Sequence, residues 1–215
     1  MAILSAHRLT CLRGARLVFE DLSFTLDAGG ALLLTGPNGS GKSSLLRVLA
    51  GLLEPFDGHL EIDGAPVASD RDGQRARIAY IGHADPVKST LTVRETLSFW
   101  ADLAGLRDRR RLDAALGALD LSALADARGA ILSSGQRRRL SLARLLVSDA
   151  DIWLLDEPTV GLDTVSVRAV EALVADHRRN GGSVVLSTHI EFTLPGGQSL
   201  DLGDYAPGAV GWVPA

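Results

Sequence analysis

Three short apolar runs separate the chain into alternating strands and helices. Such runs are typical of strands that are buried on both faces of a parallel sheet. They lie at 31–35 (ALLLT), 152–155 (IWLL) and 184–187 (VVLS). Apolar residues at helical spacing predict helices over 43–53, within 92–126, and over 136–147 and 164–180. Strands that alternate with helices predict a parallel α/β core.

Two further patterns surround this core. Residues 3–27 read as short strands with turns near Gly14 and at 28–29, and 58–67 reads as a hairpin that turns at Asp63-Gly64. Residues 77–81 form another expected strand, whereas the segment from 195 onward is rich in Gly and Pro and predicts no element. We expect one domain over 1–215. Its core and β lobe occupy about 1–83 and 133–215, with a helical lobe inserted at about 84–132.

Composition narrows the classes of function. With a net charge of −4, the chain does not have the excess of basic residues that is typical of a nucleic-acid-binding domain. The single cysteine, Cys11, allows no internal disulfide and suits a reducing compartment. No stretch reaches the ~18 apolar residues of a membrane-spanning helix. We therefore expect a cytoplasmic protein that associates with membranes only through partners.

A glycine-rich turn follows the first apolar run. It reads GPNGSGKS, which is the pattern of glycine, four residues and Gly-Lys-Ser that cradles phosphates. Its glycines let successive N–H groups point inward, and the helix that follows adds its positive N-terminus. Lys42 would bind the outer phosphates and Ser43 a Mg²⁺ ion. The alternative is a chance turn, although its place between a strand and a helix favours the cradle. The predicted phosphate-binding residues are Gly36, Pro37, Asn38, Gly39, Ser40, Gly41, Lys42, Ser43 and Ser44.

Acidic residues end the second apolar run. Asp156 would lie at the carboxyl end of a core strand, where ligands of α/β sheets collect, and would help to hold Mg²⁺. Glu157 is a natural general base for water. The alternative is a helix-capping Asp-Glu pair. His189 follows the third run and could reach the terminal phosphate, although a lone histidine there is more often structural.

With these motifs in place, the chain resembles the nucleotide-binding subunits of ABC transporters. The segment LSSGQ at 132–136 is similar to the family signature LSGGQ, with Ser134 in place of a glycine. The resemblance covers most of the chain and implies a P-loop NTPase (ABC ATPase) core with an antiparallel β subdomain and an inserted helical subdomain. It also implies a homodimer, in which each signature loop contacts the ATP held by the other subunit. The implied contact residues are Ser133, Gly135, Gln136 and Asp163.

The resemblance also assigns catalytic roles. Lys42 would handle the phosphates, Glu157 would activate water, and His189 would sense the terminal phosphate. His83 stands where the family usually has a glutamine. No aromatic residue stands where adenine is usually stacked; Arg13 falls closest, and a solvated surface arginine is the alternative. The implied cofactors are ATP and Mg²⁺.

Shorter segments resemble one branch of the family, the haem-exporter ATPases of cytochrome c maturation. They are CLRG at 11–14, LSF at 22–24, YIGH at 80–83, Lys88, LT at 91–92, the arginines 137–139 and Trp153. This resemblance implies peripheral attachment to the cytoplasmic side of the inner membrane through CcmB- and CcmC-like integral subunits. Residues 85–91 and 99–100 would line the docking groove, although ordinary packing explains Trp100 equally well. Two alternatives stay open: the ATPase of another ABC importer or exporter, and a soluble ABC ATPase that acts on nucleic acid or ribosomes.

Overall fold

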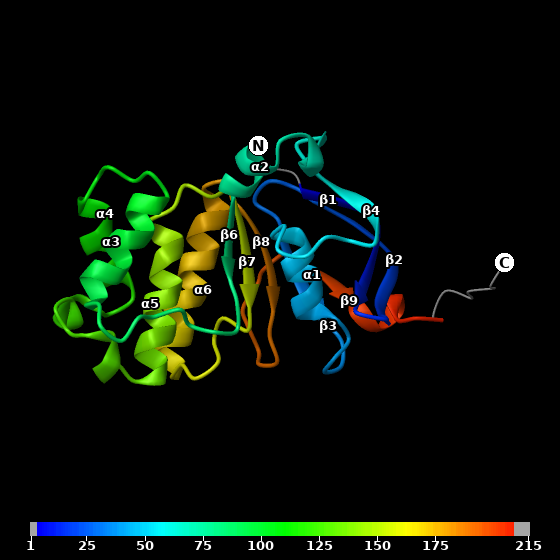
Figure 1. Ribbon diagram of the computed structural model, residues 1–215. Coiled ribbons are helices and arrows are strands. Elements are labelled where there is room, and N and C mark those ends of the chain that lie inside the picture. Colours follow the sequence, from blue (N-terminus) through cyan, green and yellow to red (C-terminus); the bar gives the residue numbers. More distant parts are fainter. Residues whose placement is uncertain (1–3, 209–215) are drawn as a thin grey trace.

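Two sheets organise the computed structural model of the chain, which describes residues 4–208 (Figure 1). Residues 1–3 and 209–215 lie outside this range. They include the start of the predicted first strand and the end of the Gly- and Pro-rich tail. The antiparallel sheet has the order β2-β1-β4-β5. Its strands are β1 (Leu4–Arg13), β2 (Arg16–Leu26), β4 (Asp57–Ile62) and β5 (Ala65–Pro66).

The second sheet is parallel throughout, in the order β6-β7-β8-β3-β9. All three apolar runs are strands at its centre, as their composition predicted. Every residue of β7 and β8 is buried, because helices or the other sheet cover both faces. The strands are β3 (Ala31–Thr35), β6 (Ile78–Ile81), β7 (Ile152–Asp156), β8 (Ser183–Ser187) and β9 (Gln198–Asp201).

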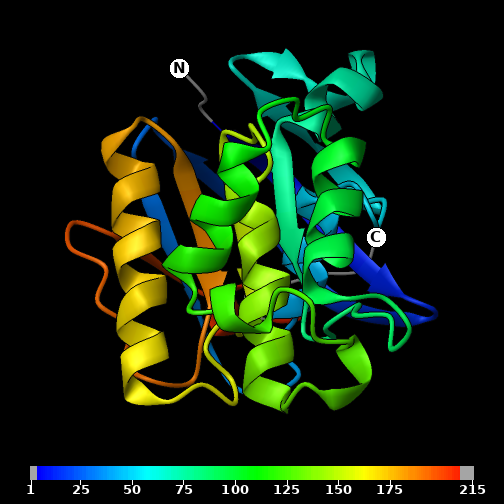
Figure 2. The same cartoon turned by 90° about the vertical axis from the view of Figure 1, so that its left-hand side faces the viewer.

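Helices cover both faces of the parallel sheet. Helix α1 lies between this sheet and the antiparallel strands, and α3 to α6 gather on the opposite side (Figures 1 and 2). The α-helices are α1 (Lys42–Leu49), α2 (Arg71–Ala76), α3 (Val93–Leu103), α4 (Arg110–Ala118), α5 (Ser134–Leu146) and α6 (Thr164–Arg179). Short 3₁₀ turns are Val67–Ser69, Ser122–Leu124, Gly129–Ile131 and Leu202–Tyr205.

The alternating side chains of β7 divide the core in two. Ile152 and Leu154 pack with α1 and the antiparallel sheet. Trp153 and Leu155 point the other way and join the cluster formed by the helices. The helices of 92–126 therefore share one continuous core with the sheet, and their division into a separate lobe at 84–132 stays a prediction.

Three elements differ from the sequence-based expectation. Helix α2 has no buried residue, so it carries no apolar stripe for a periodicity argument to detect. Strand β9 lies in the Gly- and Pro-rich segment for which no element was expected, and it pairs with β3 at the sheet edge. Helix α1 is also shorter than the predicted 43–53, because the chain turns at Gly51, which has φ of 66°.

Candidate functional site

The glycine-rich turn joins β3 to α1, and its backbone requires glycine. Gly41 has φ of 108° and forms the N-cap of α1. A Cβ atom on Gly41 would lie 2.6 Å from Val18 Cγ1 in β2, so both its backbone angle and its neighbour exclude a side chain. The turn thereby brings N–H groups and the positive end of α1 to one point, which is a geometry suited to phosphate oxygens.

Lys42 supplies the positive charge at this turn. Its side chain is almost fully buried, and Nζ donates hydrogen bonds to the carbonyl oxygens of Gly36 at 2.7 Å and Pro37 at 3.2 Å. The ammonium group is therefore held against the glycine-rich turn by two neutral acceptors. No carboxylate is within ion-pairing distance of Nζ among the described residues, so its charge is available to an anion.

Asp156 ends β7 opposite the start of α1. It is 2% exposed, and its Oδ1 accepts hydrogen bonds from Ser43 Oγ at 3.0 Å and Ser187 Oγ at 2.9 Å. Its Oδ2 is buried and has no hydrogen-bond partner. A buried carboxylate oxygen with spare acceptor capacity beside a serine hydroxyl is a donor set that fits Mg²⁺, which prefers oxygen ligands.

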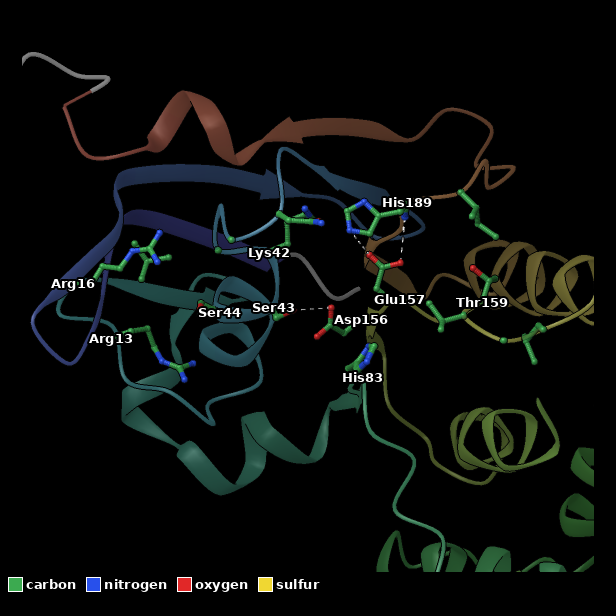
Figure 3. Close-up of a pocket in the computed structure, with 18 residues that line it drawn as sticks. Arg13, Arg16, Lys42, Ser43, Ser44, His83, Asp156, Glu157, Thr159 and His189 are labelled. Carbon is green, nitrogen blue, oxygen red and sulfur yellow. Dashed lines mark hydrogen bonds and ion pairs between the residues drawn. The ribbon is translucent and has the colours of Figure 1, made fainter. Parts of the chain in front are cut away.

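Glu157 adopts a left-handed backbone with φ of 52°, which is costly for a residue with a side chain. This conformation turns its carboxylate away from that of Asp156 and towards His189 (Figure 3). Oε2 accepts a hydrogen bond from the His189 backbone N–H at 3.2 Å, and Oε1 lies 3.3 Å from His189 Nε2. The two side chains predicted to act on water and on the terminal phosphate thus contact each other.

These groups line one cleft of about 880 Å³ (Figure 3). Arg13 and His83 also face it, as does Arg16, which the sequence did not single out. The predicted residues that line the cleft are Asn38, Gly39, Gly41, Lys42, Ser43, Ser44, His83, Asp156, Glu157 and His189. Gly36, Pro37 and Ser40 shape the turn behind them.

The signature residues lie elsewhere. Ser133 caps α5 through a capping box: its Oγ accepts from the Gln136 N–H at 3.2 Å, and Gln136 Oε1 accepts from the Ser133 N–H at 2.8 Å. Gly135 lies close to the carbonyl of Gly161. Asp163 caps α6 by accepting a hydrogen bond from the Ser166 N–H at 2.8 Å, which lowers the pKa of its carboxyl. None of the four predicted contact residues lines the cleft of its own chain.

Arg138 is a functional candidate that the motifs did not reveal. It is 3% exposed and donates to the carbonyls of Asp156 at 2.8 Å, Glu157 at 2.7 Å and Pro158 at 3.1 Å. Its Nη1 also donates to the carbonyl of Gly82 at 2.8 Å and to Asp85 Oδ1 at 3.0 Å. One guanidinium therefore ties α5 to the turn that carries Glu157 and to the loop after β6. Helical spacing could have found it, because it lies four residues before the buried Leu142.

Comparisons with known proteins identify the family. Residues 19–160 match the family model described as ABC transporter. The chain belongs to the ABC transporter family. It is 52% identical to the cytochrome c biogenesis ATP-binding export protein CcmA of Paramagnetospirillum magneticum, over 94% of each chain. The protein of that name from Rhodospirillum rubrum is 51% identical, over 96% of this chain and 88% of its own.

The fold agrees with this membership of the ABC transporter family. A solved ATP-binding subunit of an ABC transporter superposes with a TM-score of 0.80 and 30% identity, over 87% of this chain and 80% of that one. The predicted fold class, an ABC ATPase with a parallel and an antiparallel sheet, is therefore confirmed. As a member of the ABC ATPases, the chain binds ATP and hydrolyses it. Within residues 4–208, no helix combines the length and the apolar character needed to cross a membrane.

Proposed function

We propose that this chain is the ATPase subunit of a haem exporter for cytochrome c maturation. Eight relatives of 42–52% identity are named for cytochrome c biogenesis and export, which is the observation that carries the proposal. Three segments that resemble this branch lie at the cleft. Segments 11–14 and 80–83 contribute lining residues, and segment 137–139 contributes Arg138, which binds the backbone next to the cleft. Export by another ABC complex is the second candidate, and a soluble role on nucleic acid or ribosomes has no support from the charge.

Each side chain of the cleft has a role in the proposed hydrolysis. The N–H groups of the turn and Lys42 hold the phosphates, and Ser43 and Asp156 hold Mg²⁺, which would neutralise phosphate charge. Glu157 takes the proton of the attacking water, and His189 orients that carboxylate and contacts the terminal phosphate. His83 faces the cleft from the loop after β6, and Arg13 covers the adenine side of the cleft.

The proposed active unit is a homodimer. Ser133, Gly135 and Gln136 stand at the N-terminus of α5 outside the cleft of their own chain, where they are available to the nucleotide of a second copy. The capping box orders this helix end, whose partial positive charge suits a triphosphate. Asp163 begins α6 next to the loop at 159–162 that borders the cleft.

A groove beside α3 is the proposed docking site for integral membrane subunits of the CcmB and CcmC type. It is lined by Asp85, Pro86, Val87, Lys88, Leu91, Thr96, Phe99 and Trp100 and has a volume of about 340 Å³. Phe99 is 55% exposed, which is unusual for a large apolar side chain and suits a partner's surface. Trp100 is partly buried, with the Arg144 guanidinium 3.5 Å from its ring. Docking there would place the chain peripherally on the cytoplasmic side of the inner membrane.

Copurification tests this proposal. Glu157→Gln is expected to accumulate the ATP-bound complex, so tagged Glu157→Gln protein is recovered from native membranes with ATP and Mg²⁺. We expect two integral membrane proteins and a haem absorption band in the recovered complex. Phe99→Asp should lose the membrane proteins and keep ATP binding. Recovery of a different transporter without haem would move the chain to the second candidate function.

A further inference from the structure

Three metal-ligating side chains meet on one face of the antiparallel sheet, away from the nucleotide cleft. The register of β1 and β4 places His7 directly opposite His59. Glu61 follows His59 by two residues on the same strand, so it points to the same face. Two ligands at i and i+2 on one strand and a third directly across from them can converge on one point above a sheet.

The distances match such a convergence. Glu61 Oε2 lies 3.4 Å from His7 Nε2, and Glu61 Oε1 lies 3.4 Å from His59 Nε2. The three ligand atoms all lie within 4.8 Å of one another. Bonds of 2.0–2.1 Å in a tetrahedral site put ligands about 3.3 Å apart, so each carboxylate oxygen already lies at ligand spacing from one of the two histidines. Rotation of His59, whose side chain is 57% exposed, can close the remaining separation.

The ion pairs within the cluster leave His7 without a hydrogen bond at its Nε2 atom. Its Nε2 atom is shielded from solvent and makes no hydrogen bond, although the rest of the ring is half-exposed. The two imidazole rings stack with centroids 4.8 Å apart, so neither ring satisfies the other's nitrogen. A shielded nitrogen that has an ion-pair contact at 3.4 Å but no hydrogen bond is incompletely satisfied, and a bound cation at this point would satisfy it.

The backbone around the cluster is built to hold it. A bulge interrupts β1 directly after His7, where Arg8 has φ of 50°. The Arg8 backbone N–H donates to Ser23 Oγ at 2.8 Å, and its side chain pairs with Asp21. Gly58, directly before His59, packs so closely on this bulge that a Cβ atom would overlap the Arg8 carbonyl. Both histidines therefore project from positions that the backbone fixes.

We propose that His7, His59 and Glu61 form a Zn²⁺ site. Two neutral imidazole nitrogens and one carboxylate oxygen are ligands that Zn²⁺ prefers, whereas Mg²⁺ prefers oxygen ligands and stays at the nucleotide. The fourth position is open to water, because the cluster lies on the sheet surface. A bound ion would join β1 to β4 and so brace the sheet against which α1 and the phosphate turn pack.

Calorimetric titration of the full chain with ZnCl₂, without nucleotide, tests the site. We expect one ion per chain, with affinity lowered at least tenfold by His59→Ala and by Glu61→Gln. His189→Ala is the matched control, because it removes the histidine of the other histidine–glutamate pair, and it should keep the affinity. Zinc should also raise the melting temperature of the unaltered chain and leave that of Glu61→Gln unchanged.

Other results would overturn the proposal. Zinc bound equally well by His59→Ala and Glu61→Gln, but lost in His189→Ala, would place the ion in the nucleotide cleft. If no heat of binding were measured at millimolar zinc, the chain would not bind the ion, and the cluster would be only a set of ion pairs. Melting curves in EDTA separate both results from misfolding, since variants of these surface residues should melt like the unaltered chain. Co²⁺ absorption bands of tetrahedral type, present in the unaltered chain and absent in Glu61→Gln, would give the ligand geometry independently.

Discussion

Arg138→Lys is expected to lower turnover without loss of nucleotide affinity. The arginine donates five hydrogen bonds, three of them to the backbone carbonyls of residues 156–158, a segment that includes the two carboxylates proposed to act in hydrolysis. A lysine keeps the charge, but its single ammonium cannot reach acceptors on both sides of α5. The turn at Glu157, which is already held at φ of 52°, would lose the contacts that keep it there.

The size of the effect follows from burial and geometry. A hydrogen bond from a charged donor contributes about 1.5–3 kcal/mol, and breaking a buried ion pair costs about 3–5 kcal/mol. Asp85 is 21% exposed, so water recovers part of this loss. We expect the free energy of unfolding to fall by about 2–3 kcal/mol. A shift of the Glu157 carboxylate by about 1 Å would lower kcat on the order of 10²-fold.

Steady-state ATP hydrolysis and calorimetry separate these effects. Arg138 does not line the cleft, so KM for ATP should stay within about threefold. Arg111→Lys is the matched control, because Arg111 binds Asp149 and the carbonyls of Leu146 and Ser148 in the same manner, away from the cleft. Arg111→Lys should lower the free energy of unfolding and leave kcat unchanged.

One result would refute the reasoning about Arg138. If Arg138→Lys were destabilised by 2–3 kcal/mol as estimated above and kept kcat within about twofold, the arginine would only support the fold. A large rise in KM with unchanged kcat would instead make it part of nucleotide binding. Both outcomes are visible because denaturant unfolding is measured on the same preparations.

Four further predictions test other groups. Glu157→Gln should keep ATP binding, accumulate an ATP-bound dimer and lower kcat by roughly 10²–10⁴-fold, because the proposed general base is lost. Lys42→Ala should weaken ATP binding about tenfold or more, because a charged donor is removed from the phosphates; calorimetry measures this. Ser133→Arg should abolish hydrolysis and leave ATP binding by the monomer intact, because the side chain would obstruct the partner's nucleotide. Burial lowers the pKa of His177, so the unfolded chain binds more protons and stability is lost as pH falls below the unfolded pKa of about 6.5. Thermal unfolding of His177→Phe should show a smaller loss between about pH 7.5 and pH 5.5.

Controls and contrary outcomes complete these tests. Near-normal hydrolysis by Glu157→Gln would place the base on another residue. Lys88→Ala changes the chain's only other lysine and should keep ATP affinity, so equal affinities for it and Lys42→Ala would remove Lys42 from the cradle. Ser122→Arg adds the same charge at an exposed serine away from the signature, and full activity of Ser133→Arg would contradict the homodimer. If stability depended on pH in the same way in His177→Phe and in the unaltered chain, the loss of stability at low pH would be assigned to other groups.

Local constraints explain what could be predicted from the sequence. The phosphate turn needs backbone angles that glycine adopts, so Gly36, Gly39 and Gly41 reveal it without knowledge of any distant residue. The central strands were also predictable, because burial on both faces leaves no polar position in a run before its last residue. The structure has Asp156 at the end of β7 and Glu157 directly after it, at the edge of the sheet where the turn lies, and their roles in catalysis stay a prediction.

Elements without an apolar pattern were not predictable in this way. Helix α2 has no fully buried residue and depends on its Asp70 cap and on contacts such as Arg71 with Glu54. Strand β9 reads QSLD and becomes a strand only because β3, more than 160 residues earlier, offers its edge. Such pairing is a property of the assembled sheet, and no local propensity encodes it.

The sequence by itself determined the order of the motifs, the buried strands and the phosphate turn, because each depends on neighbouring residues. Only the tertiary structure decided how they meet. It placed Glu157 against His189, left Asp156 Oδ2 without a hydrogen-bond partner beside Ser43, and brought one buried arginine to the backbone carbonyls of Asp156 and Glu157. These contacts join residues that are far apart in the chain, and their distances depend on packing between strands and helices that periodicity alone cannot orient.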